Sequence, residues 1–215
     1  MKRKDVTIID YGSGNLLSLK RAFEFCGVNV IITSNYKIIS NASRLVLPGV
    51  GAFGNAMKKI NILNLKEEII STAEKGIPFL GVCLGMQLLM SESEEFGSHK
   101  GLNLLQGKVK SIKDIIKNKK DLKIPLIGWK TIHKTDLKNI NDPNFLKNIK
   151  ESDFFYFLHS FVSIPNNVYE RKYDMIYEGI KLPAIIGKKN IFGFQFHPEK
   201  SGRVGLKLLE EFLKV

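Results

Sequence analysis

Cys83 lies in a segment whose residue types can present a reactive thiol. The apolar run from Ile77 to Val82 predicts a buried strand, and the residues from Leu84 to Met90 predict the start of a helix. Cys83 therefore falls on a sharp turn from strand to helix, with Gly81 and Gly85 two residues to either side. A nucleophile elbow has this pattern, and a helix start favours a thiolate. We predict that Cys83 is a nucleophile.

A segment far downstream can supply the base that a cysteine nucleophile needs. The chain has four histidines, at positions 99, 133, 159 and 197. His197 is the best candidate, because Glu199 follows two residues later with the rigid Pro198 between them. This spacing lets a carboxylate orient the imidazole and stabilise the imidazolium that forms when Cys83 loses its proton. We predict His197 as the acid/base and Glu199 as its orienting group.

Thioester chemistry also needs backbone donors for an oxyanion. The N–H of Leu84, directly after the nucleophile, is well placed in an elbow. The segment Pro48 to Gly51 is a candidate for the second donor, since its glycines allow unusual backbone orientations; taken alone, it would be an ordinary turn. The glycine-rich turn from Tyr11 to Asn15 lacks the features of a dinucleotide or P-loop site. No Cys/His cluster has zinc spacing. We therefore expect no cofactor and no metal.

The first half of the chain alternates strand and helix patterns. Strands are predicted at Val6–Asp10, Val28–Thr33 and Leu45–Leu47, and helices up to about Cys26, from about Ala52, and from about Leu65 to Lys75. This alternation indicates an α/β fold with a mainly parallel sheet flanked by helices and chemistry at the carboxyl ends of the strands. Three glycine-rich turns, after Asp10, after Leu47 and around Cys83, fall at such ends and predict one cleft.

The second half predicts strands joined by turns, and hence an antiparallel addition to the sheet. The strands are expected at Val109–Ile112, Trp129–His133, Phe154–Ser163, Asp174–Tyr177, Ala184–Gly187 and Phe192–Phe196. A closing helix over Val204–Leu213 places Leu206, Leu209 and Leu213 on one face, with Leu208 and Phe212 near it. No linker or repeat is visible, so we expect a single domain over residues 1–215.

Composition limits the function classes. The chain has 215 residues, of which 44% are hydrophobic, and no apolar run approaches the roughly 20 residues that span a bilayer. The net charge of +12 comes from lysines spread along the chain, with only five arginines, which argues against nucleic acid as a partner. The two cysteines do not make a disulfide framework. We expect a cytoplasmic protein that binds neither membrane nor nucleic acid.

Six segments together resemble those of the class I, triad-type glutamine amidotransferases. Within that superfamily they resemble the glutaminase subunits of imidazole glycerol phosphate synthase, and the resemblance covers essentially the whole chain. The segments are Ile9–Asn15, Leu47–Phe53, Gly81–Gln87, Gly128–Trp129, Phe157–Phe161 and Gln195–Ser201.

The resemblance implies a reaction and a set of sites. Cys83 would attack the side-chain amide of glutamine, and ammonia would pass to a (βα)8-barrel cyclase subunit that forms imidazole glycerol phosphate and an aminoimidazole carboxamide ribotide. Glutaminase and cyclase would form a heterodimer in histidine biosynthesis. The implied oxyanion donors are Gly51 and Leu84. The implied glutamine-binding residues are Gly49, Gln87, Glu95, His159, Ser160 and Phe161. The implied partner-facing residues are Asn15, Trp129, Lys130 and Lys200.

Two segments depart from the family pattern. The family usually has Pro-His-Met/Ile-Gly-Trp-Asn where this chain has Pro125 to Lys130, and usually has Tyr at the position of Phe161. Neither change touches the predicted triad. Both fall near the expected partner face or the rim of the substrate site.

Other functions stay open at the level of sequence. One is a paralogous glutaminase that supplies ammonia for surface-sugar biosynthesis, which rescue of a histidine-requiring strain would distinguish. Another is a stand-alone Cys peptidase or γ-glutamyl hydrolase, which would turn over its substrate without a partner. A non-catalytic interaction subunit would have lost a triad member, and all three are present.

Overall fold

The apolar runs of the first half form the parallel part of an eight-stranded sheet. The computed structural model describes residues 5–117, 121–136 and 143–215. The parallel strands are β1 (Val6–Ile9), β2 (Val30–Thr33), β3 (Leu45–Leu47), β4 (Phe79–Val82) and β14 (Ile191–Phe194). The sheet order is β2-β1-β3-β4-β14-β13-β12-β9, so a strand from near the end of the chain pairs with β4 in the middle.

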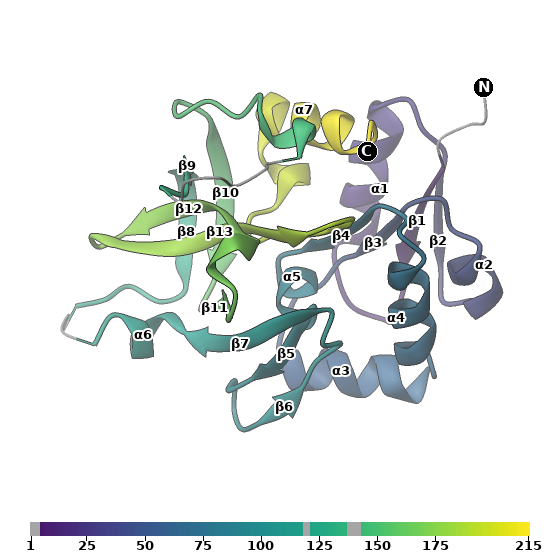
Figure 1. The fold of residues 1–215 in the computed structure, drawn as a ribbon, viewed down its shortest axis with the longest axis horizontal. Coiled ribbons are helices and arrows are strands. Elements are labelled where there is room, and N and C mark those ends of the chain that lie inside the picture. Colours follow the sequence, from purple (N-terminus) through teal and green to yellow (C-terminus); the bar gives the residue numbers. More distant parts are fainter. Residues whose placement is uncertain (1–4, 118–120, 137–142) are drawn as a thin grey trace.

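Helices cover both faces of this sheet (Figure 1). On one face lie α1 (Leu16–Phe25) and α7 (Gly202–Phe212), which contribute Phe23 and Leu209 to an apolar cluster with Ile8 of β1. The second cluster contains residues of the helices on the other face. These are α2 (Tyr36–Ser40), α3 (Phe53–Ile62), α4 (Lys66–Glu74) and α5 (Leu84–Leu88). Ile8 and Ile9, which are consecutive residues of β1, belong to opposite clusters, as expected for a strand buried on both faces.

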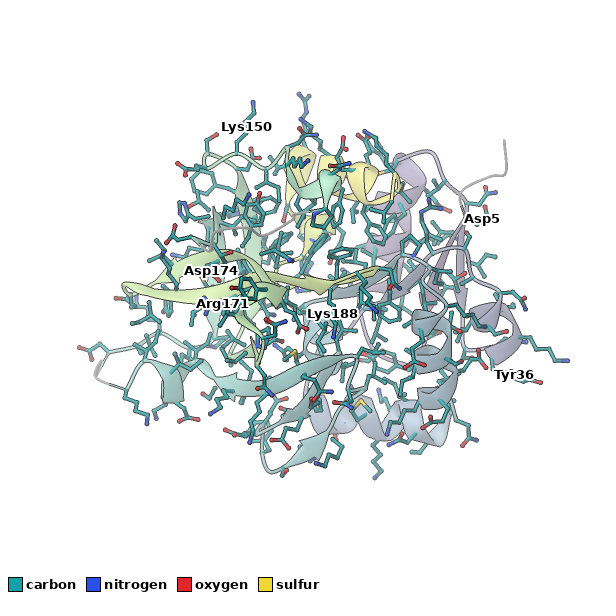
Figure 2. The ribbon with its side chains drawn as sticks, in the orientation of Figure 1. Asp5, Tyr36, Lys150, Arg171, Asp174 and Lys188 are labelled. Carbon is teal, nitrogen blue, oxygen red and sulfur yellow. The ribbon has the colours of Figure 1, made fainter. Side chains whose placement is uncertain are left out.

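The second half adds antiparallel strands. The main sheet continues through β13 (Ile180–Lys188), β12 (Arg171–Tyr177) and β9 (His133–Lys134). A four-stranded sheet consists of β5 (Met90–Ser93), β6 (His99–Lys100), β7 (Leu105–Ser111) and β11 (Phe161–Pro165), with the short helix α6 (Ile112–Ile115) after β7. A separate pair consists of β8 (Leu126–Thr131) and β10 (Phe154–His159). On β12, Arg171 and Asp174 form an ion pair of 2.8 Å (Figure 2).

The predicted α/β class, with a mainly parallel sheet and an antiparallel addition, is confirmed, but three details differ from the expectation. The helix after Cys83 ends at Leu88, because Met90 already pairs as the first residue of β5. The expected strand Phe154–Ser163 is two strands, since β10 pairs with β8 and β11 pairs with β7. At the C-terminal helix, Leu208, Leu209, Phe212 and Leu213 are buried as expected, but Leu206 is only half-buried.

None of the helices in the described part of the chain is long and apolar enough to cross a membrane.

Small residues allow α5 to pack against the ends of β3 and β4. A Cβ atom on Gly85 would lie 1.8 Å from the carbonyl oxygen of Leu47, and one on Gly81 would lie 2.6 Å from the carbonyl oxygen of Gly85. Both obstacles are backbone atoms, which cannot move without displacing a strand or the helix. The turn at Cys83 therefore requires glycine on both sides.

We predict that Gly85→Ala lowers the free energy of unfolding by about 3 kcal/mol, because the methyl group overpacks against Leu47. The matched control is Gly76→Ala, where φ is +84° but no atom lies within 4 Å of the added Cβ. There the backbone penalty alone should cost about 1 kcal/mol. Urea denaturation of the two variants measures the difference, and equal losses would contradict this account of the turn.

Candidate active site

Cys83 occupies a strained backbone position between β4 and α5. Its φ is 54° and its ψ is −111°, a combination that costs about 1–3 kcal/mol for a residue other than glycine. The backbone N–H of Cys83 donates to the carbonyl oxygen of Phe194 at 2.7 Å, and its carbonyl accepts from the Gln87 N–H at 3.3 Å. The side chain is buried but lines a cavity. The predicted elbow is therefore present.

The pairing of β4 with β14 brings the two distant segments together. In the parallel register Val82 lies opposite Phe194, so the residues after both strands emerge side by side at the carboxyl edge of the sheet. His197 then follows Phe194 by three residues and Cys83 follows Val82 by one. These short intervals bring the imidazole and the sulfur to the wall of the same cavity, where Cys83 acts on the pKa of His197.

A ring of hydrogen bonds fastens the His197 backbone to β10. The N–H of His197 donates to the Tyr156 carbonyl at 2.9 Å, and the Ser201 hydroxyl donates to the His197 carbonyl at 2.6 Å. The N–H of Tyr156 in turn donates to the Ser201 Oγ at 3.0 Å. Below this ring the buried Phe196 packs against Phe155, with ring centroids 4.3 Å apart. The position of the imidazole is thus set by backbone and core, not by a free loop.

His197 and Glu199 form a buried pair, with His197 Nδ1 2.8 Å from Glu199 Oε1 and side chains 4% and 3% exposed. An ionised carboxylate only accepts, so Nδ1 carries a proton and Nε2 is the atom left to face Cys83. Burial alone lowers the pKa of His197, but hydrogen bonds to Cys83 and Glu199 and their charges outweigh it and raise the pKa to about 10. The site therefore favours the protonated, imidazolium form of His197.

A cavity of about 280 Å³ opens beside this pair. Its lining contains Cys83 and His197, and most of the residues that the resemblance implied for glutamine. The lining residues are Val50, Gly51, Cys83, Leu84, Gln87, Glu95, Phe96, Pro125, Leu158, His159, Ser160, Phe161 and His197. Gly49 is not among them, because it lies behind the wall, where a Cβ would meet the Tyr11 hydroxyl at 2.6 Å.

Polar groups at one end of the cavity can hold an amino acid. Glu95 Oε2 accepts from the N–H of Phe53, the first residue of α3, at 2.6 Å, and burial raises the pKa of Glu95. The Gln87 side-chain nitrogen donates to the Phe161 carbonyl at 3.0 Å and to Gln195 Oε1 at 3.2 Å. Both N–H groups of the Gln87 amide are thereby used, so its oxygen is the atom left for a ligand.

His159 is a neutral imidazole in the same wall. Its Nδ1 lies 2.9 Å from the Phe161 carbonyl, which can only accept, so Nδ1 carries the proton. Burial, with a smaller contribution from the charge of His197, outweighs the hydrogen bond to Phe161 and lowers the pKa of His159 to about 4. His159 thus cannot replace His197 as the charged partner of Cys83 near neutral pH.

The turn after β1 is tied to the loop that carries the predicted oxyanion donor. The Tyr11 hydroxyl donates to the Pro48 carbonyl at 2.9 Å, and the Ser13 hydroxyl donates to the Val50 carbonyl at 2.7 Å. Gly51 follows with a φ of +95°. Sequence reasoning had dismissed the Tyr11–Asn15 turn as a nucleotide site and missed this supporting contact. The contact could have been expected because the two turns follow β1 and β3, which are neighbouring parallel strands.

The residues expected to face a partner do not all lie together. The ring of Trp129 packs edge-on against that of Tyr156, with centroids 5.9 Å apart, and the ammonium of Lys200 lies 5.9 Å from the centroid of the same Tyr156 ring, so both expected residues lie beside Tyr156. Lys130 lies on the opposite face of β8, with its ammonium 5.8 Å from the ring centroid of Tyr177. Asn15 is exposed at the start of α1.

Phe161, which stands where the family usually has tyrosine, packs at the rim of the cavity. Its ring packs edge-on against the exposed Phe96, with centroids 6.3 Å apart. Both residues line the cavity.

Comparisons with known proteins agree with the fold and the site. The family model "Glutamine amidotransferase class-I" matches residues 7–215. The chain belongs to the class I glutamine amidotransferase family.

Curated relatives that match nearly the whole chain belong to one group within this family. The imidazole glycerol phosphate synthase subunit HisH 1 of Legionella pneumophila (strain Paris) is 45% identical over 98% of this chain and 99% of its own length. The corresponding HisH subunit of Aquifex aeolicus is 44% identical over 95% of this chain and 94% of its own. Among solved structures, PurLQS from Thermotoga maritima matches with a TM-score of 0.73 over 99% of this chain and 98% of its own, at 16% identity, which shows the shared fold.

We predict that Glu199→Gln lowers the pKa of His197, since the hydrogen bond and charge of Glu199 both raise it. A folded-state pKa near 10 against 6.5 means that the folded chain holds this proton more tightly than the unfolded chain. This contribution to the free energy of unfolding is complete below pH 6.5 and is lost as the pH rises toward 10. The difference between wild type and variant should therefore be largest near pH 6 and shrink toward pH 10.

Urea denaturation across this pH range, with NMR titration of His197, measures both effects. Glu151→Gln, at an exposed turn, is the control and should show no such pH dependence. A difference for Glu199→Gln that stays constant from pH 6 to pH 10 would refute the assignment.

Proposed function

We propose that this chain is the glutaminase subunit of an imidazole glycerol phosphate synthase, and that Cys83, His197 and Glu199 are its catalytic triad. The observation that carries the proposal is the buried His197–Glu199 pair next to Cys83 on its elbow, at the wall of a cavity large enough for an amino acid. The HisH names of relatives about 45% identical over nearly the whole chain support the same assignment.

The geometry suits two-step hydrolysis of the glutamine amide. Cys83 Sγ attacks the side-chain amide carbon, and His197 Nε2 gives its proton to the leaving nitrogen, which departs as ammonia. A glutamyl thioester remains. His197 then takes a proton from water, the hydroxide attacks the thioester carbon, and the carbon–sulfur bond breaks to release glutamate; the proton stays on the imidazole or passes to the Cys83 sulfur. Glu199 keeps the imidazole in the required orientation.

The negative charge that develops on the amide oxygen needs backbone donors. Leu84 is the first residue of α5, so its N–H is not used within the helix. Gly51 lies across the same cavity, next to the Val50 carbonyl that Ser13 holds. We assign the N–H groups of Leu84 and Gly51 to the oxyanion.

The amino acid end of glutamine would sit at the polar end of the cavity. Its ammonium group complements Glu95 and the free oxygen of Gln87. Its carboxylate complements backbone N–H groups of residues 159–161, which line the same wall. This assignment orients the side-chain amide toward Cys83.

An apolar surface beside the cavity supports a cyclase partner. On the outer face of β8 and β10, Ile127 lies opposite Leu158 and Trp129 lies opposite Tyr156. Ile127 is 58% exposed and Trp129 is 51% exposed, and Leu158 also lines the cavity. A (βα)8-barrel cyclase docked on this face would cover the cavity mouth and receive the ammonia. Lys200, over the Tyr156 ring, would lie at this interface, whereas Lys130 would not.

We predict that Cys83→Ala lowers the glutamine hydrolysis rate about a thousandfold or more, because no nucleophile remains. Binding of the cyclase, and the ability of the cyclase to use free ammonia, should be unchanged. Glutamate release and cyclase turnover with ammonium salts measure the two effects. Loss of both would mean that Cys83 is structural.

We also predict low glutaminase activity for the isolated chain and a rise of about a hundredfold when the cyclase and its ligand bind. Docking on the face that includes Leu158 orders one wall of the cavity, and a misplacement of about 1 Å is worth a factor of this size. The glutaminase rate with and without the cognate cyclase measures the rise. High activity without a partner would favour a stand-alone hydrolase.

A further inference from the structure

A chain of buried amide groups leads from the cavity wall to the nucleophile. The Phe161 carbonyl accepts from Gln87, Gln87 donates to Gln195 Oε1 at 3.2 Å, and the Gln195 side-chain nitrogen lies 3.9 Å from Cys83 Sγ. Gln195 is fully buried, and Gln87 is 5% exposed, so water does not compete for these groups. The resemblance gave Gln195 no role of its own.

The orientation of each amide in this chain follows from its neighbour. A backbone carbonyl can only accept, so the Gln87 nitrogen must face Phe161. The same nitrogen donates its second N–H to Gln195, which requires the Gln195 oxygen on that side. The Gln195 NH₂ group is then the end that faces the sulfur. The Phe161 carbonyl, acting through the Gln87 and Gln195 amides, therefore determines that an N–H donor faces Cys83.

We propose that Gln195 is a positioning residue of the active site, whose side-chain N–H donates to Cys83 Sγ and stabilises the sulfur as a thiolate. Its effect depends on the state of the sulfur. A thiolate accepts from both Gln195 and His197, whereas a thiol can donate to the Leu158 carbonyl, 3.8 Å away. Gln195 thus favours the ionised form that His197 and Glu199 also favour.

The parallel pairing of β4 and β14 makes this contact possible. Gln195 directly follows Phe194, and Cys83 directly follows Val82, its partner in the register. The two side chains therefore leave neighbouring strand ends at the same level. Because Phe161 also lines the cavity, the chain connects the segment proposed to bind glutamine with the sulfur that attacks it. The inference rests on the proposed function only in taking Cys83 as the nucleophile.

The test is the pH dependence of Cys83 alkylation by iodoacetamide, followed by mass spectrometry of the Cys83 peptide because Cys26 is a second free thiol. Gln195→Met keeps the length of the side chain but removes the donor. We expect the alkylation midpoint to rise by about one pH unit, the size of a hydrogen bond to a charged group. Gln195→Glu, which presents an oxygen to the sulfur, should raise it further.

Two further variants separate positioning from packing. Gln87→Met frees the Gln195 amide to rotate, so the alkylation midpoint should rise by less than in Gln195→Met. In the double variant with both substitutions, the midpoint should rise no more than in Gln195→Met alone. Gln106→Met, at an exposed glutamine on β7, should leave the midpoint unchanged.

An unchanged midpoint in Gln195→Met, with or without a loss of thermal stability, would overturn the inference. If that variant does not fold, an unchanged midpoint in Gln87→Met would overturn it equally. Neither result would affect the proposed function, because the glutaminase rate of Cys83→Ala tests that function independently of alkylation.

Discussion

The parallel pairing of β4 with β14 is the constraint on which the site depends. It joins segments 112 residues apart in the sequence, and its register places Cys83 and Gln195 directly after paired residues. The hydrogen bond from the Cys83 N–H to the Phe194 carbonyl continues this ladder by one step beyond β4. A slip of either strand by one residue would turn the side chains of that strand to the other face of the sheet and separate Cys83 from Gln195. The geometry of the proposed triad therefore depends first on the sheet register and only then on the loops.

The packing around this pairing holds a strained residue in place. A positive φ at Cys83 is tolerable because glycines on both sides let α5 approach the ends of β3 and β4. On the other side, Phe196 and the ring of hydrogen bonds through Ser201 fix the backbone that carries His197. The strain and the buried charges are both offset by a core with apolar clusters on each face of the sheet.

Part of this site could be predicted from the sequence because it depends on local spacing. The glycines around Cys83 indicate an elbow, and the interval from His197 to Glu199 fits a carboxylate on an imidazole. These patterns involve only a few adjacent residues. The α/β class was equally accessible, since strand and helix periods differ along the first half of the chain.

Other parts depend on which strands pair, and this information is not local. Lys130 was expected beside Trp129, but neighbouring residues of a strand point to opposite faces, so the two separate. The break at Ser160 arises because the chain leaves the β8 pair and joins β7. The contacts of Ser13 and Gln195 cross between strand ends that are distant in sequence, and nothing in their own segments reveals them.

The central claim is that Cys83, held on the elbow next to His197, forms a glutamyl thioester. The most direct measurement is an acid quench of the chain during turnover of glutamine with its cyclase partner, followed by mass spectrometry of the Cys83 peptide. We predict the mass of one glutamyl group on Cys83, absent without glutamine and absent in Cys83→Ala. Turnover of glutamine with no glutamyl adduct on Cys83, or an equal adduct on Cys26, would contradict the account.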